Sequence, residues 1–469
     1  MLVRDMDSWI RAAGLPDRPL PSLRIEAGPQ VHASPLGIRE GATTVLGLVG
    51  QQVADIWQAG TGQAQEVCID TRHAEVAMAS AWLLRLDGDL ATTRNARGGP
   101  IEGGFTTADD KTLYFLCAFP GLTQQTAEAL GCELTRESVT AAVRAKPAAE
   151  LEDALNKRDV TGVIVRDYAT WQSHPQGQAL ANQPVVYIER IGDAAPTPLP
   201  QGQRPLSGLR VVDATRVIAG PMCTRTLTEF GADVLHVGSP NVPDLVYTQA
   251  DTAHGKRRAF IDLDQADGAA RMRDLCSTAD VFVQSYRPDS LARRGFGPAD
   301  VAAMRPGVVY VTESAYGDEG PWRTKRGFDG NIQAATGIQA LHGPRPRPVA
   351  GGDDSPIAMA INDYCTGYWG AYGVLEALRR RAIEGGSWHV RVSLAQTAMW
   401  FLGMGSIHQP ADAMPVREAR DLAAELSEDI ESEYGLMTRL RPVLQLSETP
   451  AHWATPTVLP GHDAAQWAD

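Results

Sequence analysis

Asp363 is a carboxylate at the start of an expected helix, where it could cap the helix or take part in chemistry. It lies in the segment Ala-Ile-Asn-Asp-Tyr-Cys-Thr-Gly, just before a run of residues with helical spacing. An aspartate at such a place ordinarily accepts hydrogen bonds from the free N–H groups of the first turn, which predicts a helix N-cap. The helix dipole would also keep the carboxylate ionised and present it to a pocket. The residues alone leave both roles open.

The segment 206–223 reads Leu-Ser-Gly-Leu-Arg-Val-Val-Asp-Ala-Thr-Arg-Val-Ile-Ala-Gly-Pro-Met-Cys and predicts a strand, a turn and a helix. The stretch from Leu209 to Val212 is typical of a parallel strand buried on both faces, and Gly220 and Pro221 suit the turn that begins the helix. Free N–H groups at that helix start favour an anionic ligand. An ordinary strand-turn-helix of an α/β protein is the alternative.

Cations that could hold a small anion occur together at Lys256, Arg257 and Arg258 and again at Arg287. Runs of charge usually form a solvated face, so a binding role and a surface role both stay open. The net charge of -13 argues against nucleic acid or an acidic membrane as a partner, because both require a basic face. A small anionic ligand needs only a local cluster.

Composition indicates a soluble protein with more than one compact unit. The chain has 469 residues, of which 43% are hydrophobic, and no apolar run approaches the length of a membrane span. The first residues lack the pattern of an export signal. The six cysteines occur singly, which favours reduced thiols in a cytoplasm. His73 and Glu75 lack the Pro-Cys-x-x-Cys partner of a zinc deaminase, so we expect no metal site.

The alternation of strands and helices in the second half predicts an α/β fold with an open parallel sheet. The expected strands are near 209–213, 233–237, 258–262, 280–284 and 308–312. A smaller α+β unit precedes them. It contains expected strands at 113–117 and 162–166 and expected helices at 122–130, 137–145 and 148–156.

A proline-rich segment at 196–205 separates these two regions and predicts a linker. We therefore expect five parts. They are an N-terminal helical and strand segment at 1–100, the small α+β domain at 101–195, the linker, a Rossmann-like domain at 206–400, and a segment at 401–469 that returns to the large domain.

A weak internal repeat relates residues 38–71 to residues 361–394 without a gap. Glycines coincide at Gly47 and Gly370 and at Gly50 and Gly373, and glycines at this spacing permit close helix packing. Generic helix-strand similarity is the alternative explanation. The repeat places Glu40 opposite Asp363, which raises the question of a degenerate second site. Because no strand-turn-helix segment precedes Glu40, we expect one site per chain.

Six further segments follow the expected strand at 209–213, and they begin, in chain order, at Phe230, His254, Ala279, Pro306, Tyr316 and Arg326. Together with residues 206–223 they resemble the CoA-transferases of family III, the CaiB/BaiF group, over about residues 205–400. In a typical member the sheet domain comes first and the small domain follows. Here the small-domain-like region precedes the sheet, so the chain resembles a permuted member or a fusion of a truncated first copy with a second copy.

This resemblance implies that Asp363, with Thr366 and Gly367, reproduces the family's Asp-x-x-(Thr/Ser)-Gly pattern and is the catalytic aspartate. It implies CoA transfer from an acyl-CoA to a carboxylic acid through an aspartyl anhydride and thioester. CoA is then a substrate, no cofactor is tightly bound, and an interlocked homodimer is expected. The implied CoA-binding residues are Arg216, Val217, Ala219, Lys256, Arg257 and Arg287. Backbone N–H groups at Gly351 and Gly352, or at Ala219 and Gly220, could supply the donors that stabilise oxyanions, and plain turns at these glycines are the alternative.

Two departures bear on alternative functions. Gly238 and Ser239 stand where family members carry Glu followed by Arg or Lys, which puts adenosine binding by that route in doubt. The related α-methylacyl-CoA racemases carry a histidine where this chain has Phe328, and a phenyl ring cannot accept a proton. A racemase-like isomerase is therefore disfavoured. A CoA-binding relative without catalytic activity stays open.

Overall fold

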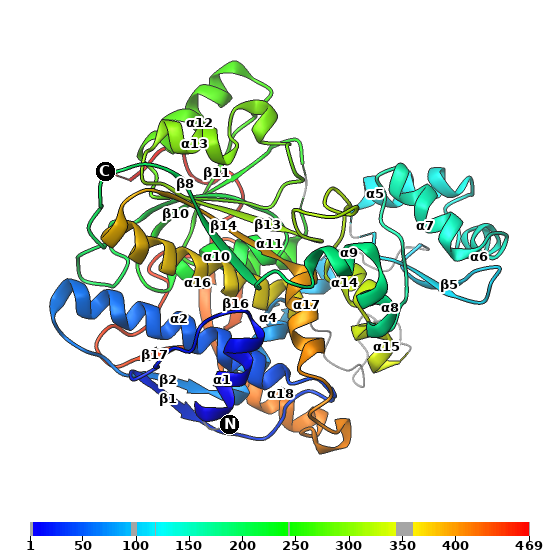
Figure 1. Cartoon of the computed structure of the whole chain (residues 1–469), viewed down its shortest axis with the longest axis horizontal. Coiled ribbons are helices and arrows are strands. Elements are labelled where there is room, and N and C mark those ends of the chain that lie inside the picture. Colours follow the sequence, from blue (N-terminus) through cyan, green and yellow to red (C-terminus); the bar gives the residue numbers. More distant parts are fainter. Residues whose placement is uncertain (1–2, 95–100, 118, 243, 344–359, 469) are drawn as a thin grey trace.

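A seven-stranded sheet forms the centre of the protein (Figure 1). The computed structural model describes residues 3–94, 101–117, 119–242, 244–343 and 360–468. The strand order is β11-β10-β9-β12-β13-β14-β8, in which β8 alone runs antiparallel to its neighbour. The strands are β8 (Val186–Gly192), β9 (Arg210–Ala214), β10 (Asp233–Gly238), β11 (Arg257–Phe260), β12 (Val281–Gln284), β13 (Val309–Ser314) and β14 (Ser387–Ser393). The predicted mixed α/β fold with a parallel sheet is confirmed.

Helices cover both faces of this sheet because successive side chains of each buried strand point to opposite sides. Val309 and Val311 of β13 pack into the core that includes α10 (Ala219–Thr228) and α16 (Ile361–Glu384). Tyr310, between them, packs into the core that includes α12 (Ala266–Thr278) and α13 (Pro298–Met304). Figure 1 shows α12 and α13 on the opposite side of the sheet from α16.

Helices α10 and α16 pack unusually closely, because glycines of α16 lie against α10. A Cβ atom on Gly367 would lie 2.5 Å from the Cβ of Met222 and 2.6 Å from the carbonyl oxygen of Ala219. On Gly370 it would lie 3.2 Å from Cys223. The start of α16 is therefore held beside the start of α10.

The small α+β unit has its own core and projects to one side of the protein in Figure 1. Its sheet has the order β5-β6-β7. The elements are β5 (Gly103–Thr106), β6 (Thr112–Phe115), α5 (Pro120–Leu130), α6 (Arg136–Arg144), α7 (Ala148–Lys157) and β7 (Val163–Ile164). Helices α8 (Tyr168–Ser173) and α9 (Pro175–Leu180) lead back to β8. Strand β8, which the sequence placed in the small unit, pairs instead with β14 of the large sheet.

The internal repeat is visible in the structure. Helix α2 (Ile38–Thr61) has 24 residues, as α16 has, and each helix is followed by a strand that leads directly into another helix. The first copy continues with β2 (Val67–Asp70) and α3 (Thr71–Val76), and the second with β14 and α17 (Leu394–Gly403). Strand β2 pairs in parallel with β1 (Leu23–Glu26) and antiparallel with β17 (Gln445–Leu446), as β14 pairs with β13 and β8. The N-terminal segment thus supplies β1 and β2 of a second sheet, which β17 completes.

The C-terminal part returns to the rest of the protein, as expected. Helix α18 (Val416–Glu425) precedes β15 (Ser427–Ser432) and β16 (Gly435–Leu440), which form a sheet with β3 (Arg85–Leu86) and β4 (Asp89–Leu90). The tail then reaches β11, where Asp463 accepts a hydrogen bond of 2.7 Å from the backbone of Arg258. Helix α1 (Val3–Ala12) packs beside α2. Among the described helices, none is both long and apolar enough to cross a membrane.

Candidate active site

Asp363 lies inside the first turn of α16, and another aspartate caps that helix. The cap position is Ala360, and α16 begins at Ile361. Asp329, the first residue of α14 (Asp329–Thr336), accepts hydrogen bonds of 2.9 Å from the N–H of Asn362 and 3.1 Å from the N–H of Asp363. Of the two roles that the sequence left open for Asp363, the N-cap is therefore excluded, because the carboxylate of Asp329 accepts these hydrogen bonds. This leaves the Asp363 carboxyl group available for chemistry.

The Asp363 carboxyl group is nearly enclosed, with an exposed fraction of 7% for the residue. Burial raises its pKa well above the ordinary value, and the nearby carboxyl groups of Asp329 and Glu313 raise it further. From the sequence we expected the helix dipole to keep this carboxyl group ionised. That expectation is wrong, because burial raises the pKa and favours the protonated form. Within the described residues, no hydrogen-bond partner of the Asp363 carboxyl oxygens is recorded.

The turn after β9 leads into α10, whose first residue packs against α16, and this region holds three of the residues expected to bind CoA. Val217 has a φ of 69°, a left-handed conformation that is strained for a β-branched residue. The N–H of Arg216 donates a hydrogen bond of 3.1 Å to the Oγ of Ser285, which follows β12. Ala219 is the first residue of α10 and lies against Gly367, one turn after Asp363. The structure therefore brings Arg216, Val217 and Ala219 close to the Asp363 turn.

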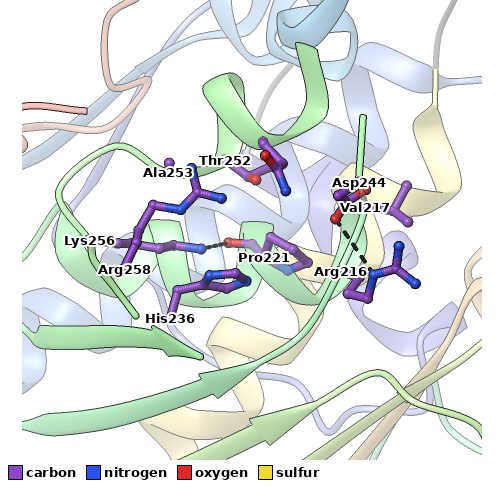
Figure 2. A pocket seen from close by; sticks show the side chains of 10 residues that line it. Arg216, Val217, Pro221, His236, Asp244, Thr252, Ala253, Lys256 and Arg258 are labelled. Carbon is purple, nitrogen blue, oxygen red and sulfur yellow. Dashed lines mark hydrogen bonds and ion pairs between the residues drawn. The ribbon is translucent and has the colours of Figure 1, made fainter. Parts of the chain in front are cut away.

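A narrow pocket opens on the other side of Arg216. It is lined by Arg216, Val217, Pro221, His236, Asp244, Gln249, Thr252, Ala253, Lys256 and Arg258. Figure 2 shows Arg216 beside Asp244, at 3.8 Å, and Lys256 reaching the carbonyl of Pro221. Its volume of about 10 Å³ is roughly that of one ordered water molecule. A nucleotide could enter this pocket only if its walls moved apart.

The cations at 256 to 258 all have protein partners. Lys256 is buried and donates 2.8 Å hydrogen bonds to Asp213 and to the carbonyl of Pro221. Arg257 forms a two-pronged ion pair with Asp233, at 2.7 and 2.8 Å. Arg258 donates to the hydroxyl of Tyr434 and the carbonyl of Val458. Their CoA-binding role stays a prediction, but the structure gives each a place in the fold.

Arg287 connects the two units of the protein. It forms an ion pair with Asp159 of the small unit, and about half of its side chain is exposed. Arg326 also pairs with Asp159, at 3.2 Å. Arg287 lies in the loop after β12, on the same sheet edge as the turn that contains Arg216.

The other residues that the sequence analysis singled out do not lie together in the structure. Phe328 caps α14 and packs on Phe119 with ring centroids 5.9 Å apart, so it presents no proton acceptor. Gly238 ends β10. Gly351 and Gly352 lie outside the described residues. No group of His, Cys, Asp and Glu side chains that could hold a metal ion occurs in the described part of the chain.

Glu40 occupies the position in α2 that corresponds to Asp363, but its surroundings differ. His408 lies 2.7 Å from one carboxylate oxygen of Glu40, and Arg39 donates to the other. Burial acts to raise the pKa of Glu40, but the hydrogen bonds from His408 and Arg39 hold it below the ordinary value. A carboxylate paired in this way is a poor nucleophile. No sheet corresponding to β9, β10, β11 and β12 accompanies α2 in the described structure.

Sequence reasoning missed two acids near Asp363. Asp329 was visible only as part of Arg-Gly-Phe-Asp, and its capping role depends on a contact with a helix far along the chain. Glu313 could have been found from the pattern of β13, because it follows Val309 and Val311 at the spacing that points to one face.

Comparison with known proteins gives this region a family. Residues 206–432 match CoA-transferase family III. Over 206 residues the chain is 40% identical to an acetyl-coenzyme A transferase, nodX, of Hypoxylon pulicicidum, which covers 43% of this chain and 34% of the relative. Over 388 residues it is 29% identical to an acyl-CoA transferase of Gibberella moniliformis, which covers 75% of this chain and 67% of the relative.

A succinyl-CoA–L-malate CoA-transferase beta subunit of Chloroflexus aurantiacus is 33% identical over 206 residues, covering 41% of this chain and 50% of the relative. The chain thus spans 34% to 67% of the length of these three relatives. A solved CaiB/BaiF family protein from Brucella suis aligns with 25% identity and a TM-score of 0.38, over 50% of this chain and 65% of that one. The matched residues, 206–432, include the turn before α10 and the start of α16, so this part of the chain is similar to CoA-transferase family III.

Proposed function

We propose that this protein is an acyl-CoA:carboxylate CoA-transferase in which Asp363 is the nucleophile. The observation that carries the proposal is the Asp363 carboxyl group, which is buried, has no recorded partner among the described residues, and lies beside the start of α10. The match of residues 206–432 to the family supports this reading. The printed functions of the relatives, acetyl-CoA, acyl-CoA and succinyl-CoA transfer, support the substrate class.

The reaction follows from the chemistry of one carboxylate. An oxygen of Asp363 attacks the thioester carbonyl, the C–S bond breaks, and CoA leaves as a thiolate, which gives a mixed anhydride. The thiolate then attacks the aspartyl carbonyl, which releases the donor acid as a carboxylate and leaves an aspartyl thioester. The acceptor carboxylate attacks that thioester, the C–S bond breaks, and a second mixed anhydride forms while CoA leaves as a thiolate. The thiolate then attacks the acceptor carbonyl, and the anhydride C–O bond to the Asp363 carboxylate breaks. Asp363 is regenerated as a carboxylate, and no proton is consumed overall.

The proposed CoA site is the crevice at the carboxyl ends of β9 and β12. Counting from β9, the order of the parallel strands is 3-2-1-4-5-6, the order of dinucleotide-binding sheets. Such sheets bind ligands where the strand order reverses, which is between β9 and β12 here. This supports the Rossmann-like interpretation of the large domain. Arg216, Val217 and Ala219 at the start of α10, and Arg287 after β12, are the groups best placed to contact CoA.

We propose that the five-part division of the chain, with boundaries at 100, 195, 205 and 400, describes its domains, except that β8 from the 101–195 part joins the sheet of the large domain. Within one chain, β8 follows the first repeat but joins the sheet of the second, while β17 follows the second repeat but pairs with the first. This exchange supports an interlocked arrangement inside the chain. A homodimer and a cytoplasmic location stay part of the proposal.

The decisive experiment is chemical trapping on the unmutated protein and on Asp363→Asn. Incubation with an acyl-CoA followed by hydroxylamine should modify the peptide that contains Asp363, as read by mass spectrometry. Asp363→Asn should abolish transfer to a panel of carboxylates and leave the far-ultraviolet circular dichroism unchanged, because the amide cannot act as the nucleophile. Transfer at a near wild-type rate in Asp363→Asn would exclude this mechanism. Binding of acyl-CoA without any trapped adduct would instead indicate a CoA-binding protein.

A further inference from the structure

An acidic side chain occupies a place in β13 where the strand pattern requires an apolar one. Val309, Val311 and Glu313 alternate along β13, so their side chains point to the same face of the sheet. The two valines pack into the core beneath α10 and α16. Glu313 is the next residue on that face and is 9% exposed. Acidic side chains are almost never buried to this degree without a partner.

Within the described residues, Glu313 has no recorded hydrogen bond or ion pair. The groups around it are acidic or neutral. Asp363 of α16 lies close enough for the carboxyl groups of Glu313 and of Asp329 in α14 to raise its pKa, and Glu313 has the same effect on Cys223 of α10. The neighbouring strands present Val392 at the paired position of β14, and Gln284, which donates to Thr312, at the end of β12. Burial raises the pKa of Glu313 to about 8. The protonated, neutral form of the side chain is therefore favoured at pH 7.

The internal repeat provides a comparison for this position. The ungapped repeat aligns Ile69 of β2 with Val392 of β14. Ile25 pairs with Ile69, and Glu313 pairs with Val392, so Ile25 is the counterpart of Glu313. The copy that lacks a nucleotide-binding sheet thus has isoleucine at this place, and its counterpart of Asp363 is the ion-paired Glu40. The buried acid occurs beside Asp363 and not in the degenerate copy.

We propose that Glu313 is a further catalytic residue, a neutral carboxylic acid that donates its O–H to the oxygen on which negative charge develops during transfer at Asp363. This inference rests on the proposed CoA-transferase function. When Asp363 attacks the thioester, the carbonyl oxygen becomes negative, and the same happens at each later carbonyl attack. A neutral donor stabilises that charge and adds none of its own to a site that already contains Asp363 and Asp329. An ionised Glu313 would instead repel the negative charge that develops on the carbonyl oxygen.

The expected pH dependence follows from this role. The donor is present while Glu313 is protonated, so turnover should fall as the pH rises through the pKa of about 8. Glu313→Gln keeps an N–H donor but cannot ionise. It should transfer CoA within about tenfold of the wild-type rate, and the alkaline fall should disappear.

Glu313→Leu removes the donor and restores the apolar pattern that Ile25 shows in the other copy. Its kcat should fall by about 10²- to 10³-fold, as when one oxyanion donor is removed, while the KM for acyl-CoA changes much less. Its thermal unfolding midpoint should stay the same or rise, because a buried acid is replaced by a well-packed apolar side chain. If Glu313 had only a structural role, Glu313→Leu would show the opposite combination, with a lower thermal unfolding midpoint and an unchanged kcat. Glu40→Gln is the matched control and should keep both the rate and the alkaline fall.

Measurement of wild type, Glu313→Gln, Glu313→Leu, Glu40→Gln and Asp363→Asn in one assay separates the possible failures. The inference is overturned if wild type is active and Asp363→Asn is inactive, but Glu313→Leu retains the wild-type kcat or Glu313→Gln keeps the alkaline fall. If wild type itself transfers no CoA, the proposed function fails. The infrared carbonyl band of a protonated carboxyl group then still tests the state of Glu313. Its absence from the wild-type minus Glu313→Gln difference spectrum at pH 7 would also overturn the inference.

Discussion

Lys256→Met should destabilise the fold far more than it affects ligand contacts, because Lys256 is one half of a buried ion pair. The ammonium group is 2.8 Å from Asp213, and the two side chains are 2% and 0% exposed. Removing one partner of such a pair leaves an uncompensated buried charge and costs about 3–5 kcal/mol. Asp213 keeps hydrogen bonds from Thr215 and Thr224, so we expect a loss near the lower end, about 3 kcal/mol.

The assay is urea unfolding at pH 7, which yields the midpoint and the m-value. Methionine has a similar volume and fits the space, so the m-value should be unchanged while the midpoint falls. Arg257→Met is the matched control. Its ion pair with Asp233 is partly exposed, and its loss should cost below about 1 kcal/mol. The double variant Lys256→Met with Asp213→Asn should recover part of the loss, because the uncompensated carboxylate is gone.

The pH dependence of this loss can be worked out from Asp213. Burial acts to raise its pKa, but the charges of Lys256 and His236 and the hydrogen bonds hold it below the ordinary value. The wild-type group therefore contributes stability above its unfolded pKa, which is lost as the pH falls through the folded pKa. In Lys256→Met the Asp213 pKa rises, and protonation relieves the buried charge. The deficit should accordingly be smaller at about pH 5 than at pH 7.

One result would refute this reasoning and restore the prediction made from sequence. If Lys256→Met keeps the wild-type midpoint but raises the KM for acyl-CoA, with a strong dependence on salt, then Lys256 holds the phosphates of CoA. The buried ion pair would in that case contribute little to the stability of the free protein.

Two further changes test the positioning of Asp363 and the number of sites. Gly367→Ala should lower both stability and turnover, because its Cβ would lie 2.6 Å from the Ala219 carbonyl and would push α16 away from α10; the cost should be about 1–3 kcal/mol in urea unfolding, and an unchanged midpoint would contradict it. Glu40→Gln should leave turnover nearly intact, and trapping with acyl-CoA should give one adduct per chain; a second adduct on Glu40 would show that the first copy is active.

Much of the fold could be predicted because parallel strands and their helices are local in sequence. The strands expected near 209–213, 233–237, 258–262, 280–284 and 308–312 are all present, within a few residues of their expected bounds. Strand β8 was not predicted as a strand, and its residues were assigned with 101–195 to the small unit, because sequence pattern does not specify a distant partner. Its pairing with β14 joins residues that are distant along the chain.

The candidate site was predicted less completely for the same physical reason. The position of Asp363 in a helix could be anticipated from spacing, but its capping partner could not. Asp329 comes from α14 and reaches the start of α16 only in the folded protein. Burial, which reverses the expected pKa direction of Asp363, also depends on packing between distant segments. The cations at 256 to 258 were visible in the sequence, whereas the acids that pair with two of them were not.

The N-terminal segment supports the fold, even though the described structure contains no counterpart of strands β9 to β12 beside α2. Its helix α2 packs beside α16 within one core, and the short helices η1 (Ala77–Ala79) and α4 (Ser80–Leu83) contact the first turns of α16. The hydroxyl of Tyr364, the residue after Asp363, accepts a 2.9 Å hydrogen bond from the N–H of Ala81 and donates to Asp251 at 3.1 Å. The first copy therefore holds the helix turn that carries Asp363. Since Glu40 is held in ion pairs and Ile25 stands at the counterpart of the buried acid, one copy provides the support and the other contains the proposed reacting groups.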